Sequence, residues 1–426
     1  MELSEHLFRH EAGRMVATLT RIFGVHNLSL AEDVVQEAFC RAIEIWKFRG
    51  VPENPSAWLM TTAKNRALDV LRRERTARTF GTELTRQLES EWTLAPTIEE
   101  QFGPGAVKDD ELRMMFSCCS PRLSEEAQVA LILHILCGFS VDEIASAFVS
   151  SHAAIEKRIT RSKRVLSGSK KLFDISGAED LARRLPAVQR ALYLLFNEGY
   201  HGASPEKAVR VELCQEALRL TDMLLKNPLG ATPSTHALAA LMSLNAARLP
   251  ARLDVSGNLT ALAEQDRSQF DQTLAEQGLR LLEQAATGPD VSDYHVEAAI
   301  AWVHTSAQRT EDTDWATIIS LYDKLMEIRP SPIVALNRAI AIAQREGPKR
   351  GLDEIHAIQD SERLTNYPFY HAALGELEIG SGHLEDARDH FVVALKLARN
   401  SMERSFFEHR ISACNEHKTY RETPNL

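Results

Sequence analysis

Basic side chains gather in two short stretches of this 426-residue chain, Lys64 to Arg78 and Lys157 to Lys171. Clustered Lys and Arg suit contacts with nucleic-acid phosphates, because each cation can displace a counterion from the backbone. Trp58 precedes the first stretch, and an aromatic ring beside a basic helix can stack on an unpaired base. The alternatives are a solvated basic face in an ordinary helical bundle and a Trp58 that belongs to the core.

Two short helices are expected to position the second basic stretch. Ser140 and Glu143 have the spacing of a capping box, which predicts that a helix begins there. The pattern breaks at Ser151, and the basic side chains of a second helix lie opposite its apolar positions. A short amphipathic helix followed by a basic one is typical of a helix-turn-helix, whose second helix enters the major groove of DNA.

Two longer helices are expected to position the first basic stretch. Ser29 and Glu32 show another capping-box pattern, followed by an apolar face with a helical period. Glu37 and Arg41 are spaced for an ion pair on the opposite face. The Asn-Pro step that ends at Pro55 then predicts the start of a second, basic helix. The expected core face of the first helix consists of Val34, Val35, Ala38, Phe39, Ala42, Ile43 and Trp46.

Charge divides the chain into two different halves. The net charge of −10 is unfavourable for nucleic-acid binding until it is divided along the chain. Residues 1–172 carry 23 acidic and 23 basic side chains, whereas residues 173–426 carry 36 acidic and 26 basic ones. Phosphate contacts depend on local clusters, so the neutral half stays a candidate for DNA binding. The hydrophobic and charged fractions, 44% and 25%, are ordinary for a globular protein and exclude little.

The cysteines and the apolar segments bear on other classes of protein. Six cysteines occur without a CxxC pair, which indicates neither a disulfide framework nor a zinc site. Cys118, Cys119, His134 and Cys137 could be imagined as zinc ligands, but their apolar segment fits buried small side chains better. The longest apolar run is too short to span a bilayer, and the charged N-terminal segment is unlike a signal peptide. We expect a cytoplasmic protein without a membrane segment, metal or cofactor.

Helical patterns continue through residues 173–426, and one of them resembles a known repeat. HAALGELEIGSGHLEDARDHFVVALKLA has the spacing of a tetratricopeptide unit, and a weaker copy ends near Pro330. This half is predicted to be an α-solenoid or repeat-like bundle with a groove for a peptide or a partner surface. The residues that carry the repeat pattern are Leu374, Gly375, Ala387, Phe391 and Ala394.

Polar islands in the same half contain no recognisable catalytic arrangement. Glu198, Asp266, Arg267, Ser268 and Asp271 offer carboxylates and a hydroxyl. Their spacing matches no Ser-His-Asp, metal-binding or P-loop signature. We expect Asp266 and Asp271 to cap helices and to pair with Arg267 or a neighbour, and we expect no enzymatic activity.

The order and spacing of these segments resemble bacterial RNA polymerase sigma factors of the extracytoplasmic-function class. The resemblance rests on AEDVVQEAFCRAIEIW, on NPSAWLMTTAKNRALDVLRRER and, after a spacer, on the predicted helix-turn-helix. It implies an all-α fold in which the first helix docks on the clamp helices of the polymerase β′ subunit. The second helix would then recognise and melt the −10 promoter element. The helix-turn-helix would read the −35 element, with the β flap as a further polymerase contact.

The resemblance implies three sets of site residues. The polymerase-facing set is Asp33, Gln36, Glu37 and Arg41, and the −10 set is Trp58, Lys64, Asn65, Arg66, Arg72 and Arg73. The −35 set is Ser151, His152, Lys157, Arg158, Arg161, Lys163 and Arg164. The recognition helix departs from the usual pattern of the class at His152, Ala154 and Glu156, so base preference at −35 cannot be carried over.

The whole chain also resembles one subgroup of this class, whose members have a long C-terminal tetratricopeptide-like domain. The matching stretches are LFNEGY, EQDRSQFD, TDW and PSPIVALNRAIA. In this subgroup the extension is thought to govern activity, often alongside a small DGPF-type protein. The expected domains are sigma region 2 at 1–76, an acidic linker at 77–109, the region 4 helix-turn-helix at 110–171 and a helical repeat regulatory domain at 172–426.

Two functional hypotheses follow from these patterns. The first is a transcription initiation factor that binds core RNA polymerase and promoter DNA, with its own C-terminal domain controlling its activity. The alternative is a DNA-tethered helical-repeat scaffold or sensor that regulates transcription without acting as a sigma subunit. The two differ in their need for polymerase, because a sigma factor generally requires the core enzyme to bind promoter DNA.

Overall fold

The computed structural model describes residues 5–78, 110–148, 150–168, 178–201, 209–254 and 259–422. Within these ranges the secondary structure is helical, with one isolated bridge between Leu253 and Leu259 and no strand, which confirms the all-α prediction. The linker expected at 77–109 lies outside the described residues, apart from the end of α3. No described helix has both the length and the apolar character needed to cross a membrane.

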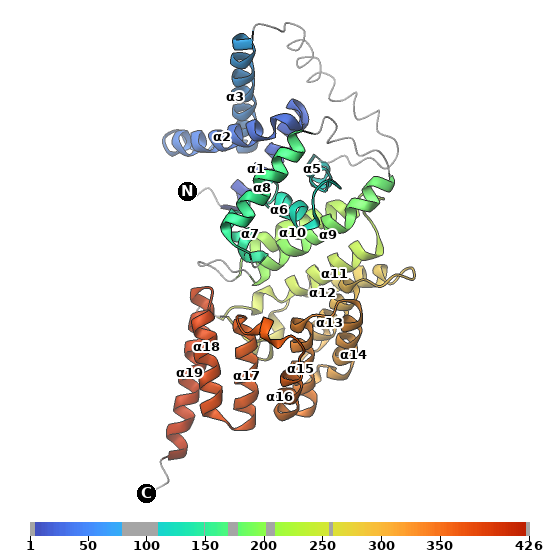
Figure 1. Cartoon of the computed structure of the whole chain (residues 1–426), viewed down its shortest axis with the longest axis vertical. Helices are drawn as coiled ribbons and strands as arrows, with labels where there is room; N and C mark the ends of the chain where they lie inside the picture. The colour runs from blue at the N-terminus through green and yellow to red at the C-terminus, as the bar shows by residue number, and fades with distance from the viewer. Residues whose placement is uncertain are drawn as a thin grey trace. The chain divides into compact units, whose positions relative to one another are not determined.

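The chain forms two compact units, whose segments can be found in Figure 1 by the colour bar for residue number. Unit 1 comprises residues 1–195 and 219–231, and unit 2 comprises residues 196–218 and 232–426. The division therefore falls within α9 (Ala178–His201) and α10 (Val211–Leu225). The domains expected from the sequence were defined by function, whereas these units are defined by compactness. The expected domain boundaries therefore stay predictions.

Unit 1 combines the N-terminal helices with α5 to α8, the first part of α9 and the last part of α10. At Gly13 of α1 an added Cβ would lie 2.1 Å from the carbonyl oxygen of Leu136, so a glycine is what lets α1 approach the end of α6. Arg21 and Asp110 form an ion pair of 2.8 Å between α1 and α5. The helices are α1 (Glu5–Phe23), α2 (Leu28–Arg49), α3 (Pro55–Arg78), α5 (Asp110–Cys118), α6 (Glu125–Ile135), α7 (Val141–Ala147) and α8 (His152–Ser167).

Local capping signals set two helix starts as predicted. The backbone N–H of Ser140 donates to Glu143 Oε2 at 2.7 Å, and the N–H of Glu143 donates to Ser140 Oγ at 3.2 Å. This exchange confirms the capping box at the start of α7. Asn54 accepts a hydrogen bond from the N–H of Ala57 at 3.0 Å, and α3 begins at Pro55, as its Asn-Pro step predicts.

Two predictions for α2 are wrong. No capping box forms at Ser29 and Glu32, because α2 begins at Leu28 and Ser29 already lies inside the helix. Ile43 was expected in the core but is 54% exposed. Ala42 and Trp46, one helical turn apart, take the inner face and turn Ile43 toward solvent.

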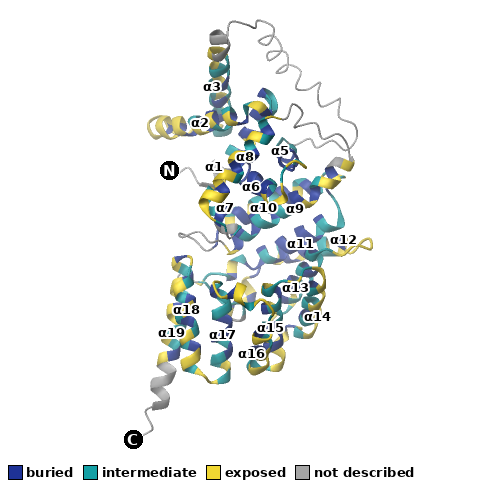
Figure 2. Cartoon of the chain, in the orientation of Figure 1, coloured by how far each residue is buried: buried dark blue, intermediate teal, exposed yellow. Residues whose placement is uncertain are grey.

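Unit 2 is a series of helices, most of which pack against their neighbours along the chain. Most residues of α11 (Pro233–Ala247) are buried, as the dark blue ribbon in Figure 2 shows, and the helix packs against α12 (Gln272–Ala285) and α13 (Asp293–Ser306). The helices that follow are α14 (Trp315–Ile328), α15 (Pro332–Glu346), α16 (Pro348–His356), α17 (Pro368–Ser381), α18 (Leu384–Leu397) and α19 (Ser401–Glu422).

The helix pair α17 and α18 packs as the local sequence pattern predicts. A Cβ at Gly375 would lie 2.8 Å from the ring of Phe391, so the two helices interlock at a small and a large residue. Ala387, Phe391 and Ala394 are fully buried in the same contact. The packing agrees with the repeat pattern, while the assignment as a tetratricopeptide domain stays a prediction.

Candidate nucleic-acid interface

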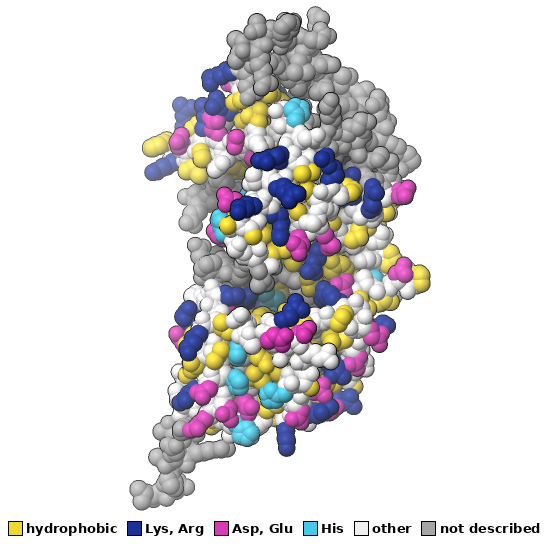
Figure 3. Space-filling view, viewed as in Figure 1, with side chains coloured by type: hydrophobic (Ala, Val, Ile, Leu, Met, Phe, Trp, Pro, Cys, Tyr) yellow, Lys and Arg dark blue, Asp and Glu magenta, His cyan; other side chains and the backbone are white. Residues whose placement is uncertain are grey.

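Three basic side chains form an exposed stripe on α8. Lys157, Arg161 and Arg164 are spaced at i, i+4 and i+7, so they lie on one face of the helix, and all three are exposed. None of the three has a hydrogen-bond or ion-pair partner among the described residues. Figure 3 shows basic side chains gathered over this helix. The opposite face of α8 is buried through Ile155, Ile159, Ser162 and Leu166.

The start of α8 is fixed by two other members of the −35 set. Ser151 is the N-cap residue, and its hydroxyl accepts a hydrogen bond from the N–H of Ala154 at 3.3 Å. His152 Nδ1 lies 2.6 Å from a carboxylate oxygen of Asp142 on α7. This hydrogen bond, together with the charge of Asp142, raises the pKa of His152 above its usual value. Both side chains are exposed and lie at the same end of the basic stripe.

The remaining two basic residues of the −35 set are already paired inside unit 1. Arg158 lies 3.0 Å from a carboxylate oxygen of Glu126 on α6. Lys163 lies 2.8 Å from a carboxylate oxygen of Glu32 on α2, with both side chains about three-quarters buried. The structure thus divides the −35 set into an unpaired stripe and two cations engaged by neighbouring helices. Glu32, first expected in a helix cap, instead joins α2 to α8.

Two contacts join α2 to α3 along one seam. The rings of Trp46 and Trp58 pack edge to face, with their centroids 5.4 Å apart. Arg66 Nε lies 2.7 Å from Glu37 Oε2. The i,i+4 pair expected between Glu37 and Arg41 is therefore wrong, because Glu37 faces α3 and pairs with Arg66. Trp58 is half-buried, which places it between the two interpretations that the sequence left open.

The other members of the two N-terminal sets lie on exposed helix surface or at its margin. Asp33, Gln36 and Arg41 of the polymerase-facing set are exposed on α2. In the −10 set Asn65, Arg72 and Arg73 are exposed on α3, whereas Lys64 is half-buried. Asn65 and Arg72 are spaced by seven residues, so they share one face of α3.

Phe48 is an exposed residue that the sequence analysis missed. It lies near the end of α2, 85% exposed, with the ammonium of Lys47 at 6.0 Å from its ring centroid. Ile43 and Val51 nearby are also exposed, at 54% and 40%. The sequence signal that could have identified Phe48 as exposed is the apolar period of α2. That period ends at Trp46, so Phe48 does not belong to the core face.

The polar islands of unit 2 behave as structural elements. Asp266 accepts a hydrogen bond from the N–H of Ser268 at 3.0 Å, and Asp271 accepts one from the N–H of Leu274 at 3.0 Å, so both caps are confirmed. Asp266 also accepts hydrogen bonds from Ser268 Oγ at 2.6 Å and from Gln269 Nε2 at 3.0 Å, so it pairs with neighbours, the alternative to a pair with Arg267. The guanidinium of Arg267 makes no ion pair with Asp266 or Asp271 and is turned into the unit, where the residue is only 8% exposed.

The side chains once considered as zinc ligands are part of the core of unit 1. Cys118, Cys119 and Cys137 are buried, and burial raises the pKa of the Cys119 thiol to about 12. His134 Nδ1 shares a hydrogen bond of 3.0 Å with the carbonyl oxygen of Phe139. Burial and the charge of Lys163 lower the pKa of His134. Among the described residues these side chains do not converge as a ligand cluster.

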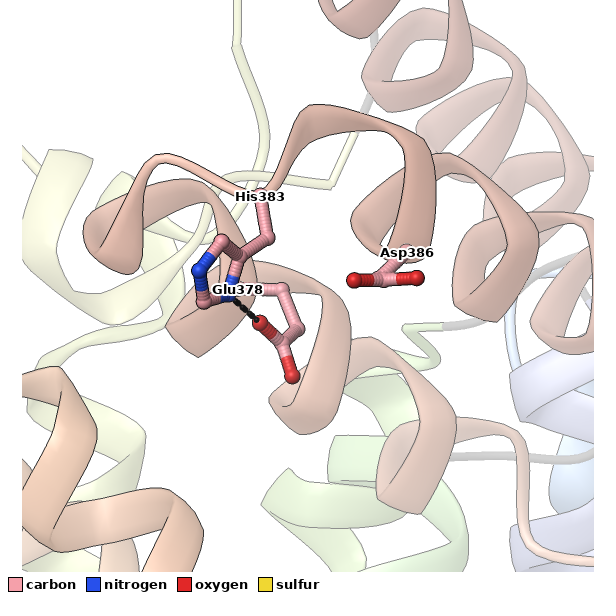
Figure 4. A group of neighbouring side chains, drawn as sticks. All are labelled: Glu378, His383 and Asp386. Atoms are coloured by element: carbon pink, nitrogen blue, oxygen red, sulfur yellow. Dashed lines mark hydrogen bonds and ion pairs between the residues drawn. The ribbon is translucent and has the colours of Figure 1, made fainter.

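Glu378, His383 and Asp386 form the one group in the described ranges with metal-ligand proximity (Figure 4). His383 Nδ1 lies 2.7 Å from Glu378 Oε2, and the N–H of His383 donates to the carbonyl oxygen of Glu378 at 2.9 Å. Between them Gly382 takes a left-handed conformation with φ 87°. These bonds stabilise the turn from α17 to α18, and His383 and Asp386 are exposed. The geometry is that of a hydrogen-bonded helix C-terminus.

Comparison with known proteins finds matches to two separate segments of the chain. Residues 7–77 match sigma-70 region 2, and residues 184–286 match a family of unknown function, DUF6596. The chain is 37% identical over 392 residues to "Uncharacterized protein R00370" of Rhizobium meliloti (strain 1021), over 92% of this chain and 91% of the relative. No solved structure matches the chain. The first match contains every residue of the polymerase-facing and −10 sets.

Proposed function

Because the chain belongs to the same family as the Rhizobium meliloti protein and begins with sigma-70 region 2, we propose that it is a sigma factor of the extracytoplasmic-function class. It binds core RNA polymerase and directs transcription from specific promoters. The observation that carries this proposal is the region 2 match, which spans most of α1 to α3. Sigma-70 region 2 belongs to a non-enzymatic type of transcription factor, so the chain acts by binding.

In this proposal α2 and α3 work as a pair. The exposed side chains of Asp33, Gln36 and Arg41 face the clamp helices of the polymerase β′ subunit. The bond between Glu37 and Arg66 fixes the docking helix against the helix that captures the −10 element. A charge-assisted hydrogen bond of this kind makes the position of α3 depend on the position of α2.

The −10 element is held by the exposed side of α3 and by the ring of Trp58, which packs on Trp46. Asn65, Arg72 and Arg73 supply polar and phosphate contacts, and Trp58 offers the free part of its ring for stacking. Packing of Trp58 on Trp46 holds that ring in place before DNA arrives. Phe48, near the start of the loop that leads to α3, adds a second exposed aromatic ring to this side.

The −35 element is read by α8. The stripe of Lys157, Arg161 and Arg164 lies along the groove and contacts phosphates, with Ser151 and His152 at the leading end of the helix. The helix-turn-helix then sits beside the polymerase β flap. Arg158 and Lys163 contribute less to DNA binding, because their charges are already engaged by Glu126 and Glu32.

The C-terminal helices complete the proposal as a tetratricopeptide-like regulatory domain, with a small DGPF-type protein as a further candidate partner. The interlocked pair α17 and α18 supports the repeat-like part of this assignment. The acidic excess of residues 173–426 supports a regulatory contact with basic surfaces.

Run-off transcription with core polymerase tests the proposal. We expect the full-length chain to bind core enzyme and to initiate from the promoter upstream of its own gene, and an Asp33→Lys, Gln36→Lys double variant to lose most of that activity. A chain ending at residue 231 is the better truncation than one ending at 171, since Arg184 and Arg219 beyond 171 bond to Phe116 and Glu111 within unit 1. Higher activity of the shortened chain identifies an inhibitory domain, and lost activity identifies a required one.

Two outcomes contradict the proposal. Absence of any complex with core polymerase removes the sigma interpretation. Tight, sequence-specific promoter binding by the full-length chain without polymerase favours the DNA-tethered scaffold or sensor instead. The unshortened chain with Glu44→Lys is the matched control for the double variant, because Glu44 is an exposed acid on the same helix outside the polymerase-facing set.

A further inference from the structure

Unit 2 buries two arginines that have no carboxylate partner. Arg248, just after α11, is 8% exposed. Its Nη2 donates a hydrogen bond to the side-chain oxygen of Gln265 at 3.3 Å. Its Nε is buried without an acceptor. Arg267 is also 8% exposed and donates to the carbonyl oxygens of His304 and Ala307 at 2.9 and 2.8 Å. Neither guanidinium makes an ion pair with a described carboxylate.

Two other arginines of unit 2 do have carboxylate partners. Arg329 pairs with Asp293 and Glu297, and Arg338 pairs with Asp323 and Glu354. Each of these less buried guanidiniums therefore has two carboxylates, whereas the more buried Arg248 has none. A buried charge without a counter-charge is strongly unfavourable, so an anion bound beside Arg248 would stabilise the folded unit.

Arg252, four residues after Arg248 along the chain, and Tyr200 supply further donors, and both of these side chains interact electrostatically with Arg248. The guanidinium of Arg252 stacks 4.3 Å from the ring centroid of Tyr200, and its Nη2 lies 3.3 Å from His201 Nδ1. Tyr200 is 4% exposed, and its hydroxyl is buried without a partner. Positive charge therefore accumulates here without a described acid to balance it.

Accessibility differs within the cluster. The side chain of His201 is exposed and that of Arg252 is half-buried, whereas Arg248 and Tyr200 are buried. All of these residues lie within the segment that matches a family of unknown function.

We propose that Arg248, Arg252 and Tyr200 form a binding site for the oxyanion of a small molecule, a phosphate or a carboxylate group. Guanidinium groups and a phenolic hydroxyl match the acceptor geometry of both anions. The bound anion would supply the negative charge that no described carboxylate provides to Arg248. The site lies in unit 2 and does not depend on whether the chain acts as a sigma factor.

Thermal unfolding and calorimetric titration of the full-length chain test this site. We expect sodium phosphate or sodium malonate to raise the midpoint of unfolding more than sodium chloride of equal ionic strength. In Arg248→Met the anion affinity should fall at least tenfold, while the midpoint without anion stays the same or rises, because an unpaired buried charge has been removed. Arg338→Met is the matched control, since its guanidinium already has two acids, and it should keep the anion response.

The same measurements can overturn the proposal. A wild-type response no larger than that to chloride excludes the site, and so does an anion response that survives in Arg248→Met. If Arg248→Met fails to fold, Arg252→Met at the half-buried side takes its place, with the same expected loss of anion affinity. A response to phosphate alone assigns a phosphorylated ligand, and a response to malonate alone assigns a carboxylate.

Discussion

His304 illustrates how a single buried side chain makes the stability of unit 2 depend on pH. It is 8% exposed, packs edge to face on Trp315 at 5.4 Å, and lies near Arg248 and Arg267. Burial and these two positive charges lower its pKa to about 3. The unfolded chain takes up the proton below pH 6.5, whereas the folded unit does not, so the free energy of unfolding decreases as the pH falls.

We therefore expect His304→Phe to flatten the pH dependence of unit 2. The phenyl ring keeps the contact with Trp315 but cannot be protonated. The contribution of His304 falls by about 2 kcal/mol between pH 7 and pH 5, at about 1.4 kcal/mol per pH unit below 6.5. Urea unfolding at both pH values measures it, and equal slopes for the wild-type and variant chains would show that His304 is not the titrating group.

At this scale, the sequence predicts what is local and misses what depends on packing. The caps at Ser140 and Asn54 could be predicted, because a cap and its N–H partner lie within three residues. Glu32 and Glu37 matched local patterns equally well. Their partners, Lys163 and Arg66, come from other helices, and only the folded unit brings them within 3 Å.

At the scale of the element, α8 has an unpaired basic stripe on one side and cations held by neighbouring helices on another, and on the proposed function the stripe contacts DNA. Arg161 lies in the unpaired stripe, whereas Arg158, three residues earlier, is held by Glu126. We expect Arg161→Ala to weaken promoter binding by polymerase carrying this subunit and to reduce the slope of log affinity against log salt by about 0.9, the loss of one phosphate contact. Arg158→Ala is the control and should change the slope less. An unchanged slope in Arg161→Ala would exclude the phosphate contact.

Helices and their inner faces could largely be read from the sequence, because the apolar period reports which side is buried. That period predicts the helix-turn-helix and the buried side of α8. It fails at the end of α2, where Ile43 continues the pattern but Ala42 and Trp46 already fill the inner face. The site of Arg248 was equally unpredictable, since a lone arginine after an apolar helix has no local signal of burial.

At the scale of the molecule, unit 1 packs α8, the helix of the −35 set, against α2, which in turn packs on the helix of the −10 set. The ion pair between Lys163 and Glu32 places α8 directly against α2, and Gly13 permits the contact of α1 with α6. The −10 and −35 elements are about 25 base pairs apart, on the order of 85 Å along the duplex at 3.4 Å per base pair. On the proposed function, these contacts must therefore open before both elements are bound.

We expect Glu32→Lys to favour the open arrangement, because it sets two positive charges against each other at the contact between α2 and α8. Cys40 is the exposed one of the six cysteines and lies on α2, so a spin label there and one at Lys157→Cys on α8 report the separation. The label distance should lengthen in Glu32→Lys and stay unchanged in Glu44→Lys, which makes the same charge change on an exposed part of α2. Gly13→Ala should lengthen it independently, since its Cβ cannot fit against Leu136. Unaltered distances in both variants would mean that neither contact holds unit 1 closed.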